Sequence, residues 1–166
     1  DGGGAGLTTP ATHTVSVTWD INDRFSLMAE GVHTGWDSLR EIRIEFDNPL
    51  QADAAEDHNW HDSWFYSLGG EYKFNDKFTF RAGFARDESP VAFQHRTPRM
   101  PDQDRNWYSL GATWAVNDNI EVTGSYVRVQ MTQRPEIDIL SSSGSRLVGE
   151  YRGGADLYGI SAQYKF

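Results

Sequence analysis

The segment Leu157-Tyr-Gly-Ile-Ser-Ala-Gln-Tyr-Lys-Phe166 decides the fold of this chain. Side chains of an extended strand alternate between two faces, so this segment has one apolar face and one polar or small face. The apolar face carries Tyr158, Ile160, Ala162, Tyr164 and Phe166, and the other carries Gly159, Ser161, Gln163 and Lys165. A final strand that is amphipathic, rich in aromatic residues and closed by Phe is typical of β-barrels of the Gram-negative outer membrane. The segment therefore predicts a membrane protein.

The composition agrees with a barrel better than with a soluble domain. The 166 residues include no Cys and carry a formal net charge of −9, and the mean hydropathy is negative. No stretch approaches the roughly 18 apolar residues of a spanning helix, but barrel strands need only about ten residues of alternating character. Aromatic residues make up 13% of the chain and include six Trp, a residue suited to membrane interfaces. The acidic balance argues against nucleic acid as a partner.

Three similar dipeptides punctuate the sequence: Asn22-Asp23, Asn75-Asp76 and Asn117-Asp118. Asn and Asp favour tight turns and tolerate left-handed backbone geometry, so each dipeptide predicts a short hairpin connection. Long polar connections lie between them, at about 48–61, 88–104 and 132–153. Short turns that alternate with long loops match the periplasmic and extracellular sides of a barrel.

The alternation predicts seven strands, at about 11–20, 24–47, 62–74, 77–88, 104–115, 119–131 and 154–166. The C-terminus and the three Asn-Asp turns should all lie on the periplasmic side of the membrane, so an even number of strands must separate them. Residues 24–47 must then form one unusually long strand and not a hairpin. Its apolar positions also change parity, from Phe25 and Leu27 to Ile42 and Ile44. A shift of one residue reverses the faces of a strand, so we predict a β-bulge near Gly35. A soluble β-sandwich also has alternating strands, but it would hide its aromatic faces behind short loops at both ends.

Seven strands do not make a complete single-chain bacterial barrel, which has an even number. An open sheet edge in lipid also leaves backbone groups without hydrogen bonds. We therefore expect the C-terminal half of a larger antiparallel transmembrane β-barrel, which spans residues 1–166. The N-terminal half would be cleaved off, a separate chain or simply outside this sequence, and would be a partner of this one.

Several segments resemble the outer-membrane long-chain fatty acid and hydrocarbon transporter family (FadL/TodX type). They are Trp19 with Phe25, His33-Thr-Gly-Trp-Asp-Ser38, Phe78-Thr-Phe-Arg-Ala-Gly-Phe84, Asp87-Glu-Ser-Pro-Val91, Arg96-Thr-Pro-Arg-Met-Pro-Asp-Gln-Asp-Arg105 and Trp107-Tyr-Ser-Leu-Gly111. The resemblance extends from about Leu7 to Phe166. It implies the last seven strands of a fourteen-stranded barrel.

The resemblance also implies passive uptake of hydrophobic molecules such as fatty acids or hydrocarbons, without a cofactor. By the same resemblance, we expect a monomeric barrel that an N-terminal plug closes and that releases substrate sideways into the membrane. The plug and the kinked strand of the lateral opening would belong to the missing half.

Apolar side chains on the polar, inward face are candidates to line the path of a hydrophobic substrate. They are Met28, Val32, Phe65, Val127 and Val129. Packing against the plug is an equally good explanation of these residues. A nearby cation would offset the desolvation of a fatty acid carboxylate, and Arg81 and Lys73 are inward candidates. The alternative for both, and for Lys165, is an ion network in the lumen with Glu71 and Glu121.

The loop from Ser89 to Arg105 holds three prolines, which restrict its backbone. We expect its Arg96, Arg99 and Arg105 to hold the loop over the mouth of the barrel through hydrogen bonds. Contact with lipopolysaccharide phosphates or with a substrate carboxylate is the alternative.

Other candidate sites in the sequence are weak. His58-x-x-His61 with neighbouring aspartates lies in a polar loop, and Asp102-x-Asp104 lacks the remaining ligands of a calcium loop. No nucleophile motif surrounds any Ser. We therefore expect neither a metal site nor an enzyme. The alternative to transport is a structural or surface-receptor barrel whose loops bind phage or other cells.

Overall fold

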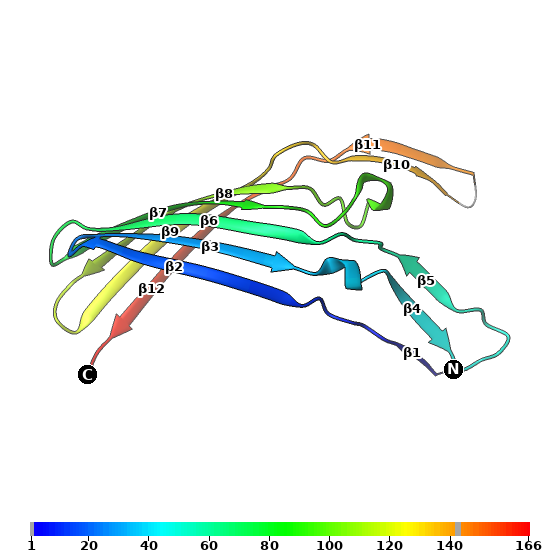
Figure 1. The fold of residues 1–166 in the computed structure, drawn as a ribbon, viewed down its shortest axis with the longest axis horizontal. Helices are drawn as coiled ribbons and strands as arrows, with labels where there is room; N and C mark the ends of the chain where they lie inside the picture. Colours follow the sequence, from blue (N-terminus) through cyan, green and yellow to red (C-terminus); the bar gives the residue numbers. More distant parts are fainter. Residues whose placement is uncertain (1, 142–143) are drawn as a thin grey trace.

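The computed structural model describes residues 2–141 and 144–166, and almost every element in it is a β-strand (Figure 1). The strands are β1 Gly3–Ala5, β2 Thr12–Asn22, β3 Phe25–Thr34, β4 Glu41–Phe46, β5 Ala54–Asp57, β6 Ser63–Lys73, β7 Phe78–Asp87, β8 Arg105–Ala115, β9 Ile120–Met131, β10 Glu136–Leu140, β11 Arg146–Glu150 and β12 Gly154–Tyr164. Two short 3-10 helices complete them, η1 Trp36–Ser38 and η2 Phe93–His95. Within the described ranges, no helix is long and apolar enough to cross a membrane.

Seven of these strands form one antiparallel sheet in the order β12-β9-β8-β7-β6-β3-β2. Among these seven strands, neighbours in the sheet are also consecutive along the chain. A short turn or a long connection joins each pair. The three short turns and the C-terminus lie at one end of the sheet, and the long connections lie at the other (Figure 1). This arrangement confirms the predicted all-β, antiparallel fold class. It also confirms the predicted alternation of short turns and long loops.

The single long strand predicted at 24–47, with a bulge near Gly35, is wrong. β3 ends at Thr34, η1 interrupts the chain, and β4 belongs to a separate three-stranded sheet with β1 and β5. The apolar residues change from odd to even positions because the η1 segment between β3 and β4 is not extended. The two strands therefore need not continue one alternation, and no bulge is required. The register shift in this part of the sheet lies elsewhere, between β2 and β3 at Asp20 and Asn22.

Each Asn-Asp turn is closed by its Asn side chain. The Oδ1 atom of Asn75 accepts hydrogen bonds from the backbone N–H groups of Lys77 and Phe78, at 2.9 Å each. Asn22 and Asn117 accept the same pair of bonds in their turns. None of the three has a positive φ, so the tolerance of left-handed geometry is not the reason for Asn here. The side chain replaces a backbone acceptor in the turn.

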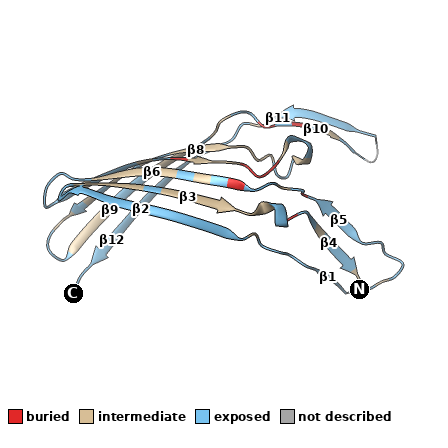
Figure 2. Cartoon of the chain, in the orientation of Figure 1, coloured by how far each residue is buried: buried red, intermediate tan, exposed pale blue. Residues whose placement is uncertain are grey.

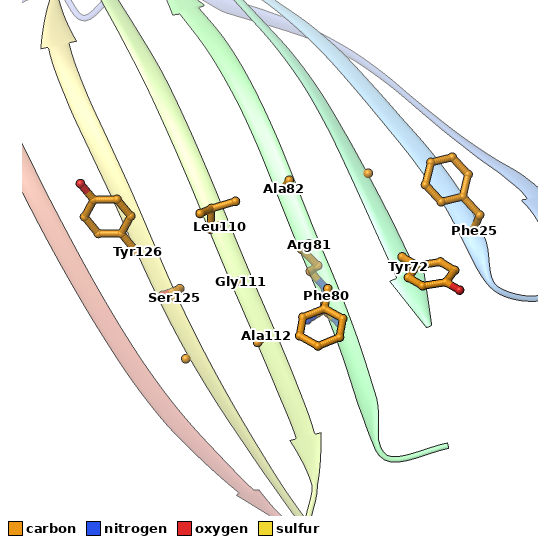
Figure 3. A pocket seen from close by; sticks show the side chains of 12 residues that line it. Phe25, Tyr72, Phe80, Arg81, Ala82, Leu110, Gly111, Ala112, Ser125 and Tyr126 are labelled. Carbon is orange, nitrogen blue, oxygen red and sulfur yellow. The ribbon is translucent and has the colours of Figure 1, made fainter. Parts of the chain in front are cut away.

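The main sheet has two chemically different faces. Leu110 and the rings of Tyr72, Phe80 and Tyr126 lie on one face, which we call the outer face (Figure 3). The register of β6 places Leu68 on the same face. Leu68 and Leu110 are about 60% exposed, an arrangement that water would penalise and lipid would favour. Along β8, the residues of the opposite, inner face are more covered than those of the outer face. β2 and β12 at the two edges are exposed along their whole length (Figure 2).

Candidate functional site

A groove of about 520 Å³ lies across the middle of the inner face. Its inner-face lining comes from all seven strands of the main sheet and is mostly apolar: Met28, Phe65, Gly69, Gly83, Ala85, Trp107, Val127 and Leu157, with Ser16, Thr18, Glu30, Ser67 and Ser109. Glu30 is the charged residue of this lining, and its Oε2 accepts a hydrogen bond of 2.8 Å from Ser16 Oγ. The groove can therefore bury an apolar molecule over several strands.

Two glycines open the floor of this inner groove. Gly69 and Gly83 face one another across β6 and β7. A Cβ atom at Gly69 would meet its nearest neighbour, the backbone oxygen of Ala82, at an ordinary 3.6 Å. The groove is thus deep at Gly69 because no side chain fills it, and a larger residue there would project into open space.

A polar cluster borders the inner groove on the side of the short turns. Arg81 Nε lies 2.7 Å from Glu71 Oε2, and Arg81 Nη1 donates to Thr113 Oγ1 at 2.7 Å. Thr113 Oγ1 is in turn 2.8 Å from Thr123 Oγ1. The guanidinium of Arg81 is therefore engaged with protein partners, as in the predicted network of ions in the lumen. Lys165 is likewise paired with Glu121, at 3.3 Å.

The structure brings together three of the predicted lumen residues, Met28, Phe65 and Val127, which all line the inner groove. Val32 pairs with Phe65 across β3 and β6, and Val129 lies two residues beyond Val127 on the same face. Lys73 lies at the end of β6 next to the Asn75 turn, away from the groove. The role of all these residues in substrate binding remains a prediction.

Trp107 and Leu157 also line the inner groove, although neither was predicted from the sequence as a lumen residue. Trp107 pairs with Ala85 on one side and with Val129 on the other, and both of these neighbours are buried. The alternation of β8 could have revealed Trp107, because this residue lies an even number of positions from Ser109, Gly111 and Thr113 and therefore shares their inward face. Its apolar character made it resemble an outer-face residue, but the cross-strand register decides the face.

A second cavity of about 420 Å³ lies beyond the inner groove, toward the long loops. Its lining includes Trp36, Trp60, Val91 and Met100, and Phe65 lines both cavities. The rings of Trp36 and Trp60 meet edge to face with centroids 5.0 Å apart. Apolar surface thus continues from the loops into the middle of the sheet through Phe65.

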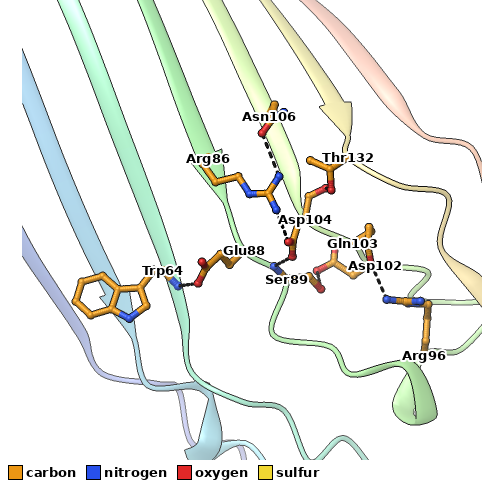
Figure 4. A network of polar contacts seen from close by, with 10 residues as sticks. All are labelled: Trp64, Arg86, Glu88, Ser89, Arg96, Asp102, Gln103, Asp104, Asn106 and Thr132. Atoms are coloured by element: carbon orange, nitrogen blue, oxygen red, sulfur yellow. Dashed lines mark hydrogen bonds and ion pairs between the residues drawn. The ribbon is translucent and has the colours of Figure 1, made fainter.

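The two sequence motifs of the 88–104 loop hold each other in place (Figure 4). Asp104 pairs with Arg86, and its Oδ1 accepts a 2.9 Å hydrogen bond from the backbone N–H of Ser89. Ser89 Oγ donates to Asp102 Oδ2 at 2.8 Å. The backbone oxygen of Asp104 accepts two more bonds from Thr132, in the next long connection. These contacts make one connected support for the loops.

The three predicted loop arginines have different surroundings. Arg96 donates to Gln103 Oε1 at 2.7 Å and to the backbone oxygen of Glu136 at 3.2 Å, so it joins two long connections. Arg105 lies 2.9 Å from Asp87 and 3.5 Å from Asp102. Arg99 lines a small cavity near Trp60 and Met100. Their predicted role in holding the loop fits Arg96 and Arg105, while contact with a ligand stays a prediction.

Ion pairs also stabilise the peripheral strands at the loop end. Arg146 donates two hydrogen bonds to Asp138 across the β10–β11 hairpin, and this lowers the pKa of the Asp138 carboxyl group. In β4, the hydrogen bonds that the Arg43 guanidinium donates to the Glu41 carboxylate raise the pKa of Arg43. A lowered carboxyl pKa contributes stability above its unfolded-state value, and this contribution is lost as the pH falls through the folded-state value. The β10–β11 pair therefore remains ionised at neutral and mildly acidic pH.

An antiparallel sheet with an apolar outer face, a grooved inner face, short turns and long loops defines a wall of a transmembrane β-barrel. The comparisons with known proteins identify the kind of barrel. The profile of the family described as "Outer membrane protein transport protein (OMPP1/FadL/TodX)" matches residues 2–166, so the chain belongs to this family. The predicted location in the outer membrane is thereby confirmed.

Individual relatives agree with this family. The chain is 32% identical to the long-chain fatty acid transport protein of Escherichia coli O6:H1 over 136 residues, which cover 81% of the chain and 29% of that protein. It is 28% identical to a FadL homologue of Pseudomonas aeruginosa of known crystal structure, with a TM-score of 0.86, over 98% of the chain and 37% of the homologue. The toluene transporter TbuX of Ralstonia pickettii has 18% sequence identity and a TM-score of 0.58, and the match covers 95% of this chain and 34% of TbuX. TbuX therefore shares the fold. The chain spans about a third of the length of these relatives. The family consists of outer-membrane transporters and not of enzymes.

Proposed function

We propose that the protein to which this chain belongs transports hydrophobic molecules passively across the outer membrane. The single observation that supports this function best is the apolar groove across the inner face. A polar lumen would need no such surface, whereas a hydrophobic substrate needs a site that buries it from water. The substrates we propose are long-chain fatty acids or hydrocarbons, since the related proteins are named as transporters of long-chain fatty acids and of toluene.

The position of the apolar surfaces suggests a direction of movement. A substrate would first meet Trp36, Trp60 and Met100 at the loop end, and would then pass Phe65 to reach the inner groove. No covalent step is required. The Glu71–Arg81 cluster would end the apolar path on the periplasmic side, where short turns of barrels lie.

We also propose that the two edges of the sheet pair with further strands of the complete protein. In the described residues β2 and β12 each have one partner, and they do not pair with each other. Free N–H and C=O groups along an edge are costly in hydrocarbon. Closure into the expected fourteen-stranded barrel would satisfy them and would enclose the inner groove.

The test is uptake by cells that lack the gene and carry the full-length protein or the Gly69→Leu variant. Leucine at position 69 would occupy the inner groove without a backbone clash, since the nearest atom to a Cβ lies at 3.6 Å. Excluding about two methylene groups of substrate at about 0.8 kcal/mol each predicts roughly tenfold weaker binding and slower uptake of radiolabelled oleate or toluene.

The matched control is Gly31→Leu. Gly31 is a mid-strand glycine on the outer face of β3, where a Cβ would also make an ordinary contact, 3.9 Å from Tyr66. This variant should take up both probes as the wild type does. Wild-type uptake in Gly69→Leu, with normal amounts of folded protein, would contradict the groove as the path. No uptake defect in the deletion strain would contradict transport itself.

A further inference from the structure

A second groove, of about 800 Å³, lies on the outer face of the sheet (Figure 3). Its floor consists of four small residues, Gly70, Ala82, Ala112 and Gly124. Larger side chains line it: Phe25, Tyr72, Phe80, Leu110 and Tyr126. We call it the outer groove. It is separate from the inner groove, because successive residues of a strand face opposite sides.

The outer groove runs obliquely across four strands. Gly70 pairs with Ala82 across β6 and β7, and Ala112 pairs with Gly124 one step nearer the short turns, across β8 and β9. Three inter-strand spacings of about 4.8 Å and one two-residue step of about 6.8 Å give a floor roughly 16 Å long. This length is about half the roughly 30 Å thickness of the hydrocarbon core, or one leaflet.

The position of the groove determines what surrounds it. All four floor residues lie in the middle parts of their strands, between the turns and the loops. In an outer-membrane barrel this level of the outer face contacts hydrocarbon and not water. An empty furrow there would deprive its lining of dispersion contacts, so a flexible hydrocarbon chain is favoured to fill it.

Polar groups lie next to one end of the outer groove. Tyr126 Oη donates to Asp156 Oδ1 at 2.7 Å, and Arg128 Nη1 lies 2.6 Å from Asp156 Oδ2. Arg128 is two residues beyond Tyr126 on the same face, toward the long loops. Ionisable and tyrosine side chains on the lipid face belong to the interface, where lipid head groups lie. The groove is therefore apolar along its floor and bordered by a charged pair at the head-group end.

We propose that the outer groove is a binding site for an acyl chain of a membrane lipid, with the lipid head group next to Arg128 and Asp156. The guanidinium group offers further donors to a lipid phosphate, although Asp156 neutralises its charge. The site requires membrane insertion only, and it does not depend on the transport function proposed above.

The experiment measures lipid binding to the full-length protein in detergent by native mass spectrometry. The probe is lipid A, the phosphorylated acyl anchor of lipopolysaccharide, because the head-group end of the groove faces the long loops and therefore the extracellular leaflet. Gly70→Leu and Ala112→Leu would each fill the floor, and the atoms nearest to a Cβ at Gly70 are side-chain carbons of Leu27 and Phe25, at an ordinary 3.7–3.8 Å. Loss of contact with about two methylene groups predicts roughly tenfold weaker retention of the lipid in either variant. Gly31→Leu, on the same face but outside the groove, should retain lipid as the wild type does. Heat-modifiable electrophoretic mobility shows in parallel that each variant is folded.

Weaker lipid retention by folded Gly70→Leu or Ala112→Leu, with normal retention by Gly31→Leu, supports the site. Equal retention by the wild type and both floor variants overturns it, and so does an equal loss in Gly31→Leu. A separate titration uses palmitate. If the floor substitutions weaken palmitate binding but leave lipid A binding unchanged, the occupant is a free fatty acid and the proposal is wrong. Oleate uptake by the Gly69→Leu variant tests transport independently of these results.

Discussion

At the scale of single residues, two adjacent positions of one strand face different surroundings, the lumen on one side of the sheet and the lipid on the other. Gly69 opens the inner groove and Gly70 lies on the floor of the outer groove, although they are consecutive in β6. Neither glycine has a positive φ, so the backbone does not require glycine at either position. Both positions are open because the missing side chain leaves space in a groove.

Arg81 provides a prediction at the same scale. Arg81→Gln should lower the free energy of unfolding by about 1 kcal/mol, because Glu71 loses its ion-pair partner in a half-exposed setting. Since Arg81 is already engaged with Glu71 and Thr113, uptake of oleate and of toluene should change to the same extent. Urea unfolding in detergent and the ratio of the two uptake rates measure these effects. A selective loss of oleate uptake would show instead that Arg81 binds the carboxylate.

At the scale of elements, the long connections are structured and held to the strands. Val91 in the 88–104 loop and Pro135 and Ile137 around the start of β10 are among the most buried side chains, whereas the outer face of the sheet is exposed. The β10–β11 hairpin and the β1-β4-β5 sheet extend beyond the main sheet at the loop end (Figure 1). The loops therefore have a small core of their own, joined to the barrel wall by Asp104 and its partners.

The Asp104 contacts predict how this loop end would loosen. Asp104→Asn keeps the side-chain size but removes the charge that pairs with Arg86 and weakens the acceptor for the Ser89 N–H. A charge-assisted hydrogen bond is worth about 1.5 kcal/mol, so hydrogen exchange at Ser89 should accelerate about tenfold. Asp76→Asn makes the same change in the Asn75 turn at the other end, and exchange at Ser89 should then be unaltered. If the exchange rate at Ser89 were unchanged in Asp104→Asn, other contacts would hold the loop in place.

At the scale of the whole molecule, the open sheet is the main feature. Across residues 2–141 and 144–166, no further strand pairs with the outer edge of β2 or of β12, and the outer face of the sheet between them suits lipid. The chain covers about a third of each relative, and the remaining length of such a relative is ample for additional strands. The inner and outer grooves lie within the sheet, so each is formed by strands of this chain.

The open edges predict different behaviour for the 166-residue chain and for the complete protein. Refolded alone in detergent, the chain should associate through its edges and elute as oligomers, because unpaired strand edges template further pairing. The complete protein should be monomeric, with heat-modifiable mobility. Size-exclusion chromatography with light scattering distinguishes these states. A monomeric chain with full strand content would mean that its edges are satisfied in another way.

The sequence by itself determined the local features of this protein. Period-two alternation located the strands of the main sheet and their apolar face, and the three Asn-Asp pairs located the short turns. These features could be predicted because each depends on residues within a few positions of one another. The break after β3 could not, because an irregular η1 segment and a bulge cause the same change of parity.

Only the tertiary structure decided which distant residues meet. Met28, Phe65 and Val127 come from three strands, and only the cross-strand register places them in one groove with Trp107 and Leu157. The same register directs Arg81 to Glu71. The terminal segment that begins at Leu157 identified an outer-membrane strand from its alternation alone. Its contribution of Leu157 to the inner groove became visible only in the folded sheet, since pairing between strands is set by long-range contacts and not by local pattern.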